Sequence, residues 1–84
     1  MTKKTKELIE MISEQNEDAL FADGFDEAII GWDSKSGRVI YSVQKMIKIL
    51  AKDDMSYEDA REYLDFNTIG AYVGEMTPIY METP

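Results

Sequence analysis

The stretch from residue 28 to residue 41, AIIGWDSKSGRVIY, decides the fold. Its two ends, 28–32 and 39–41, are rich in β-branched and aromatic residues, which favour strands. The residues between them are typical of a turn, and Gly37 occupies a position at which a positive φ is favoured. The stretch therefore predicts an antiparallel β-hairpin.

Alternation assigns the side chains of this hairpin to faces. Successive side chains of a strand point to opposite faces of the sheet. We therefore expect Ala28, Ile30 and Trp32 to share one face of the first strand. Val39 and Tyr41 should share one face of the second strand.

Three helices are predicted around the hairpin. Apolar residues recur at helical spacing over 2–21 and again over 43–52. Ser42 and Ser56 are each placed to cap the helix that follows them. The third helix begins after Ser56 and could run to residue 73.

The end of the chain completes the predicted fold. Residues 79–81, Ile-Tyr-Met, follow Pro78 and indicate a short strand that joins the hairpin at an edge. We predict one α+β domain over residues 1–84, in the order α-β-β-α-α-β. Its three-stranded, mainly antiparallel sheet is covered by about three helices on one side. The last strand could also pair with a second copy, so a homodimer is an open alternative.

The composition excludes several function classes. The 84 residues include no His and no Cys. Disulfides, Cys/His zinc sites and thiolate nucleophiles are therefore excluded, and the side chain best suited to proton transfer near neutral pH is missing. The scattered glycines match no phosphate-binding loop. We expect no catalytic residues, no cofactor and no enzymatic activity.

Hydropathy indicates where such a protein acts. No apolar run approaches the ~20 residues that cross a bilayer, and the polar start of the chain does not resemble a signal peptide. We therefore expect no membrane contact and a location inside the cell.

Charges are arranged in blocks, with a formal net charge of -8. Nine acidic and no basic residues lie within 7–33, and eight acidic residues with a single base lie within 53–84. Potentials of like charges add, so these blocks should make anionic surfaces. Direct nucleic-acid binding is disfavoured, because phosphates are contacted mainly by Lys and Arg. Acidic blocks suit a protein that mimics DNA.

The basic residues suggest a different alternative. Residues 34–52 hold five bases and no acid. If Lys35, Arg38, Lys45 and Lys48 converge, they could bind a small anionic ligand such as a nucleotide.

An acidic cluster, DGFDE at 23–27, precedes the first strand. Carboxylates in such a loop could hold Mg²⁺ or Ca²⁺. The spacing does not match an EF-hand loop. We favour capping and solvation of the loop, so no metal site is predicted, and a divalent-metal module stays an alternative.

A stripe of small residues marks the third predicted helix. Asn67, Gly70, Ala71 and Gly74 lie at i, i+3, i+4 and i+7. Such a stripe favours close packing against the sheet or the first helix, and a groove for a partner or ligand is the alternative. A break of the helix near Asn67 is also open.

Four segments carry a family resemblance: DGFDEAIIG at 23–31, MSYEDA at 55–60, FNTIGAYVGE at 66–75 and TPIY at 77–80. They resemble a family of small uncharacterised proteins of tailed bacteriophages. The resemblance covers roughly two-thirds of the chain and implies a viral origin and action in the host bacterial cytoplasm. It implies no particular chemistry, because no settled activity is associated with the family.

These observations lead to one functional hypothesis. We expect a non-enzymatic phage accessory protein that binds and modulates or inhibits a host protein, in host takeover or anti-defence. Its partner-binding surface would form if the loop at 23–27 meets the turn at 74–77. The candidate residues are Asp23, Asp26, Asn67, Tyr72 and Glu75. The same residues are also typical of helix caps and turns, and a small-ligand or divalent-metal module is the alternative function.

Overall fold

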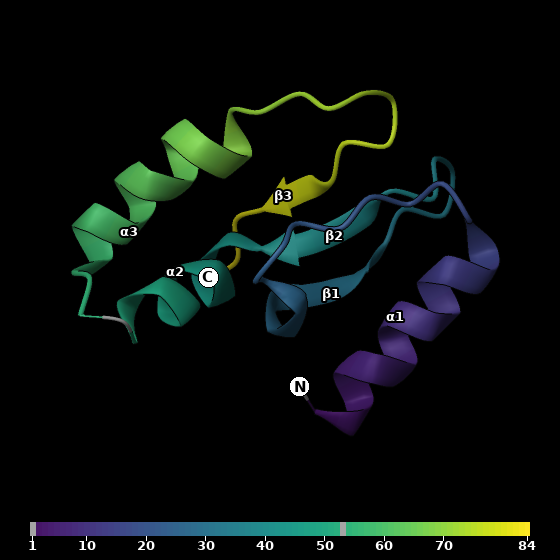
Figure 1. Cartoon of the computed structure of the whole chain (residues 1–84), viewed down its shortest axis with the longest axis horizontal. Helices are drawn as coiled ribbons and strands as arrows, with labels where there is room; N and C mark the ends of the chain where they lie inside the picture. The colour runs from purple at the N-terminus through teal and green to yellow at the C-terminus, as the bar shows by residue number, and fades with distance from the viewer. Residues whose placement is uncertain (1, 53) are drawn as a thin grey trace.

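The sheet is built on the predicted hairpin, which lies at the centre of Figure 1. In the computed structural model, which describes residues 2–52 and 54–84, β1 (Ile29–Trp32) and β2 (Val39–Ser42) pair antiparallel. β3 (Ile79–Met81) pairs with β2 in parallel, which gives the order β1-β2-β3. The α+β class and the edge position of the last strand are confirmed. The sheet is mixed, with one antiparallel and one parallel pair.

The parallel pair follows from the connection between β2 and β3. Two helices, α2 (Val43–Ala51) and α3 (Tyr57–Leu64), carry the chain away from the sheet before β3 begins. Parallel neighbours need a crossover of this kind, whereas a short turn can join antiparallel ones. The predicted element order is kept, with a 3₁₀ turn (Asp26–Ala28) added before β1 and a π turn (Asp65–Ile69) added after α3.

A bulge in β1 breaks the predicted alternation. Ile29 pairs with Tyr41, and the neighbouring residue of β2, Ile40, pairs with Gly31. Ile30 is therefore the extra, unpaired residue of the bulge. Ile29 is therefore a core residue, and Trp32, which pairs with Val39, packs against the same core. The expectation that Ile30 and Trp32 share a face is wrong, because the extra residue shifts the alternation by one position.

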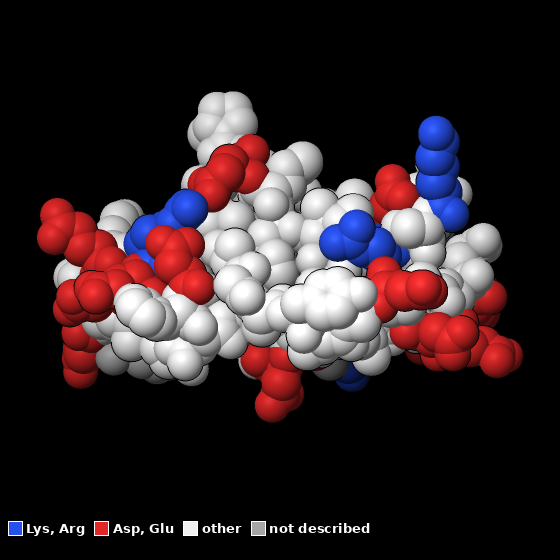
Figure 2. Space-filling view, turned by 90° about the horizontal axis from the view of Figure 1, so that it is seen from above, with Lys and Arg blue, Asp and Glu red and all other residues white. Residues whose placement is uncertain are grey.

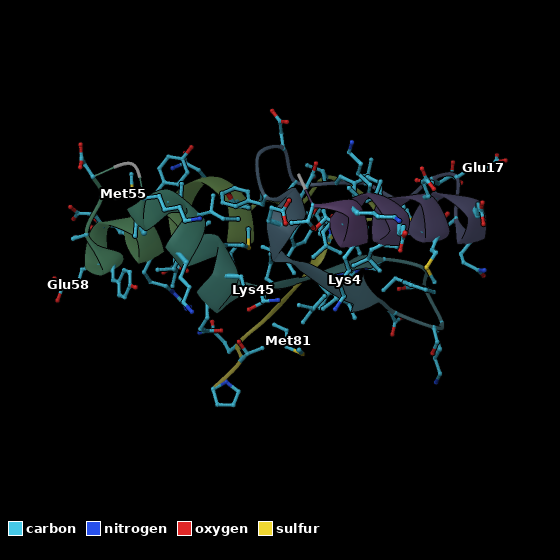
Figure 3. The ribbon with its side chains drawn as sticks, turned by 90° about the horizontal axis from the view of Figure 1, so that it is seen from below. Lys4, Glu17, Lys45, Met55, Glu58 and Met81 are labelled. Carbon is cyan, nitrogen blue, oxygen red and sulfur yellow. The ribbon has the colours of Figure 1, made fainter. Side chains whose placement is uncertain are left out.

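The core lies between one face of the sheet and the helices. Its buried apolar side chains come from every helix and from β1 and β2: Ile12, Phe25, Ala28, Ile29, Val39, Tyr41, Val43, Met46, Ala60 and Leu64. Tyr80 of β3 stacks on Tyr41, with ring centroids 5.9 Å apart. Figure 3 shows α1 on one side of the sheet and Met81 on the other.

The first helix, α1 (Lys3–Gln15), is shorter than predicted. Asn16 leaves the helical conformation, and its side-chain amide donates a hydrogen bond to the carbonyl of Gly37 at 3.2 Å. Its side-chain oxygen accepts from the N–H of Asp18 at 3.0 Å. Asn16 is thus tied to the hairpin turn, and the following residues run across the sheet as a loop (Figure 1).

The start of α1 is held by a carboxylate from another part of the chain. Glu27 accepts hydrogen bonds from the backbone N–H of Thr2 and from the hydroxyl of Thr5, both at 2.8 Å. These bonds lower the pKa of Glu27. A negative charge at a helix N-terminus is favourable, and here it offsets the lysines that oppose the helix dipole.

The third helix is also shorter than its longest predicted extent. α3 passes into the π turn at Asp65 and stops at Gly70, so a helix reaching residue 73 is wrong. A Cβ at Gly70 would lie 2.7 Å from the carbonyl oxygen of Asp65, so only glycine fits this close approach. The predicted stripe of small residues is therefore not one helical face, because Ala71 and Gly74 lie beyond the helix.

The longest helix of the fold, α1, has 13 residues. Within the described residues, no helix combines the length and the apolar character that a bilayer crossing requires.

Candidate functional site

A cleft of about 330 Å³ opens beside β3. One wall is the segment from residue 61 to residue 78, which we call the arch because it rises from the end of α3 and returns to β3 (Figure 1). The other wall is the loop that follows α1. We call this space the arch cleft. Its apolar lining is Leu20, Phe21, Ala22, Phe25, Ala71, Val73 and Pro78.

Polar groups of the arch cleft can donate or accept hydrogen bonds. They are Asp23, Tyr63, Asn67, Thr68 and Tyr80. Among the described residues that line the cleft, none is Lys or Arg. The cleft is therefore apolar with a few hydroxyl, amide and carboxylate groups, which is the usual composition of a binding site.

Thr77 organises the loop between α3 and β3. Its hydroxyl donates to the carbonyl of Gly74 at 2.6 Å and accepts from the N–H of Val73 at 2.9 Å. Gly74 has φ 115°, which a residue with a side chain rarely adopts. Arg38 of the hairpin donates to the backbone carbonyl of Thr77. The loop is thus an ordered turn fixed to the sheet.

The arch exposes large apolar side chains. Phe66 is 81% exposed and Tyr72 is 78% exposed, and the neighbouring Val73 is 60% exposed. Tyr63 on the same segment is also exposed. Leaving such side chains in water forgoes the roughly 1.5–3 kcal/mol that full burial of each would contribute. Tyr63 and Val73 also line the arch cleft, and Phe66 and Tyr72 lie on the same segment of the chain. A concentration of exposed apolar side chains is the signature of a binding surface.

Negative charge borders this surface. Figure 2 shows the molecule from the arch side, with acidic groups gathered toward both ends and a middle that is mostly uncharged but includes basic groups. Arg61 on α3 is engaged by two carboxylates, Glu82 at 2.8 Å and Asp65 at 3.4 Å. These contacts raise the pKa of Arg61 and lower that of Glu82. The arch side therefore offers acidic groups to a partner, while its arginine is already paired.

The structure separates the residues predicted to form one surface. Asp23 and Asn67 both line the arch cleft. Tyr72 and Glu75 are exposed on the loop of the arch. Asp26 lies outside the cleft, in a separate hollow lined also by Lys52. The 3₁₀ turn that begins at Asp26 takes its side chain away from that of Asp23.

Other residues of this surface were not singled out from the sequence. Tyr63, Phe66 and Val73 were expected on a helix, where an aromatic or aliphatic side chain is more often part of the core. Pro78 was expected only as the residue before the last strand, and Tyr80 only as part of that strand. The signal that could have identified them is the large number of aromatic residues for a small core.

The basic residues of the middle block do not converge on one site. Lys45 lies near Lys4 of α1, Lys35 lies in the hairpin turn and Lys48 lies beside Tyr57 of α3. Figure 3 shows Lys4 and Lys45 at the middle of the molecule. Arg38 is bonded to the backbone carbonyl of Thr77. The predicted anion site required these four basic side chains to converge, and they do not.

Two phenols near the cleft stay protonated at neutral pH. Burial raises the pKa of Tyr41 to about 12, and it raises the pKa of Tyr80 as well. The Tyr41 oxygen accepts a hydrogen bond from the N–H of Ala22 at 2.7 Å. Over residues 2–52 and 54–84, no group of three or more acidic residues is placed to hold a metal ion. The chemistry that this arrangement supports is hydrogen bonding and apolar contact.

No family model matches the chain, and the comparisons with curated proteins and with solved structures found no match. The resemblance to tailed-bacteriophage proteins therefore stays a prediction.

Proposed function

We propose that this protein is a non-catalytic binding module, a phage accessory protein that captures and modulates a bacterial host protein at the arch cleft. The observation that carries the proposal is the exposure of Phe66, Tyr72 and Val73 on the arch. The cleft beside them is lined by Val73, Asp23 and Asn67. Aromatic side chains of this kind dominate the energetics of protein interfaces. The host cytoplasm is the proposed place of action.

The charge distribution supports a basic partner surface. Acidic groups border the arch, and the chain as a whole has a formal net charge of -8. Complementary charge speeds association and selects among partners. A host enzyme that binds DNA would present such a surface, and in that case the acidic blocks would compete with DNA phosphates.

The test is affinity capture from bacterial lysate with tagged wild-type protein and the Tyr72→Ala variant. We expect one host protein to elute with the wild type and to be lost with the variant. Tyr57→Ala is the matched control, because Tyr57 is 63% exposed but lies in another hollow of the surface. Equal capture by all three proteins would exclude the arch as the binding surface, and no captured protein would exclude the proposed function.

Charge reversal provides a second variant pair. Asp23→Lys should weaken capture, and Asp26→Lys tests whether the separate hollow contributes. Glu10→Lys on α1 makes the same charge change on an exposed helical position away from the arch. Each variant is first checked for an unchanged melting temperature. Capture by Asp23→Lys equal to that by Glu10→Lys would contradict a role for the cleft charge.

Competition with duplex DNA distinguishes a protein that mimics DNA from one that binds its partner mainly through apolar contacts. If the acidic blocks imitate phosphates, DNA should displace the protein from its partner, and binding should weaken steeply with salt. Salt-insensitive binding would contradict mimicry and leave the apolar contacts of the arch as the main interaction.

A small-ligand module is the second candidate, because the cleft volume of about 330 Å³ lies at the lower end of ligand pockets. Thermal-shift measurements with nucleotides and with divalent ions test it, since a ligand that binds the folded state raises the melting temperature. A shift that Ala71→Arg abolishes would favour this candidate over protein capture.

A further inference from the structure

β3 has a free edge next to the arch cleft. The sheet order ends with β3, whose pairing partner is β2. Within residues 2–52 and 54–84, no backbone hydrogen bond joins β3 to a segment other than β2. Pro78 and Tyr80 line the cleft, so this edge borders it. An unpaired edge is a template for another strand.

We infer that the arch cleft receives an extended segment of the partner, which pairs with β3 as a fourth strand and carries apolar residues flanked by Lys or Arg. This inference rests on the proposed function and specifies the chemistry of its partner. Strand addition at a sheet edge is an established way to bind a peptide, with backbone bonds giving affinity and alternate side chains giving specificity.

The surroundings of β3 on the two faces of the sheet indicate which side chains of the partner segment should be apolar. Tyr80 faces the core side, where it stacks on Tyr41, so alternation directs Ile79 to the other face. An added strand would place alternate side chains into the arch cleft, against Phe21 and Val73. The intervening side chains would lie beside half-buried Ile79. Apolar residues therefore suit both faces of the segment.

The charges define its flanks. Asp23 lies in the cleft wall, Glu75 is exposed on the loop, and the cleft lining that the structure describes contains no base. A second copy of this chain is a poor occupant, because its acidic blocks would face these acids. Its basic stretch, 34–52, is already folded as the hairpin turn, β2, α2 and the C-cap of α2. The complementary partner is a cationic one.

Selection from a random peptide display library tests the inference directly. Immobilised wild-type protein should enrich peptides with an apolar centre and flanking Lys or Arg. Ala71→Arg places a bulky cation in the cleft at an exposed position, and we expect it to bind the selected peptides at least about tenfold more weakly. Ala71→Ser is the control and should bind as the wild type does.

Amide hydrogen exchange of the complex identifies the strand pairing. A selected peptide should slow the exchange of at least one amide within Ile79–Met81. The same peptide N-methylated at alternate residues keeps its side chains but loses backbone donors, and one of the two registers of methylation should abolish binding. Enrichment of acidic peptides, equal binding to Ala71→Arg, unchanged exchange in β3, or no enriched peptide would each overturn the inference.

The lysate experiment separates this inference from the proposed function. Capture that Tyr72→Ala abolishes, together with any of those contrary peptide results, would leave the function standing and remove strand addition. A failed capture removes the function itself.

Discussion

The β1 side and the β3 side of the sheet differ in how many large apolar side chains they leave in water, Met11 on α1 against Phe66, Tyr72 and Val73 on the arch. On the β1 side, α1 buries Ile12 completely, and its N-terminus is bonded to Glu27. On the β3 side, the arch leaves Phe66 and Tyr72 largely in water. A domain this small has few apolar side chains to spare, so this exposure is a cost in stability. Under the proposed function, the β1 side maintains the fold and the exposed side chains of the arch contact the partner.

The largest effect is expected from two positions of the arch that are two residues apart. Leu64 is fully buried, and Leu64→Ala should reduce the free energy of unfolding by about 2–5 kcal/mol. Phe66→Ala should change it by less than about 0.5 kcal/mol, because the ring is 81% exposed. Urea unfolding of both variants measures this. Similar losses for the two would mean that the arch is a structural element and not an exposed surface.

A smaller effect is expected where the loop after α1 meets the core. Tyr41→Phe removes the oxygen that accepts from the N–H of Ala22, at a cost of about 1 kcal/mol. The wild type has a folded-state pKa of about 12 at Tyr41, above the ordinary value of 10.0. The folded state therefore disfavours the ionised phenol by about 3 kcal/mol, so the stability of the wild type is complete below pH 10 and falls by about that amount as pH rises through about 12.

The measurement is the free energy of unfolding across this alkaline range. The wild type should lose stability steeply, and Tyr41→Phe should lose less, so the gap between them should close and then reverse as pH rises toward about 12. Tyr80 keeps a raised pKa in both proteins, so its contribution cancels in the difference. A gap that is independent of pH would show that the Tyr41 phenol is not held in its neutral form.

The bond between Glu27 and α1 should contribute less, because its carboxylate is solvent-exposed. The pKa of Glu27 is lowered in the folded state from 4.5, so its contribution is complete above that pH and is lost as pH falls through the folded-state value. Glu27→Gln should lower the melting temperature at about pH 7, and the difference from the wild type should shrink as pH falls below 4.5. If the two melting temperatures still differed in strong acid, where the carboxyl is protonated, the effect of Glu27 would come from the shape of its side chain and not from its charge.

Local signals in the sequence predicted the hairpin and the edge strand, because a turn and β-branched runs act within a few residues. The end of α1 could not be predicted in this way. It depends on the bond between Asn16 and Gly37, which are 21 residues apart. The orientation of β3 likewise depends on the path of α2 and α3.

The candidate site was only partly accessible from the sequence. Asp23 and Asn67 both line the cleft, whereas the 3₁₀ turn separates Asp26 from them. Tyr63 and Phe66 are aromatic residues in a helical segment, Tyr63 in α3 and Phe66 in the π turn, and both are exposed. Exposure of this kind is a property of the packed molecule and has no local sequence signal.

The smallest effect is expected at the attachment of the arch to the C-terminal segment. Arg61 contacts Glu82 at 2.8 Å, but both side chains are exposed, at 41% and 56%. Ion pairs of this type contribute little, because solvent screens them and both side chains lose rotamer freedom. A double-mutant cycle with Arg61→Gln and Glu82→Gln should give a small coupling at low salt that vanishes in high salt. A coupling that survives high salt would mean that the arch, like α1, is fastened by its polar contacts. The contrast between the two sides of the sheet would then lie in the exposed aromatic side chains alone.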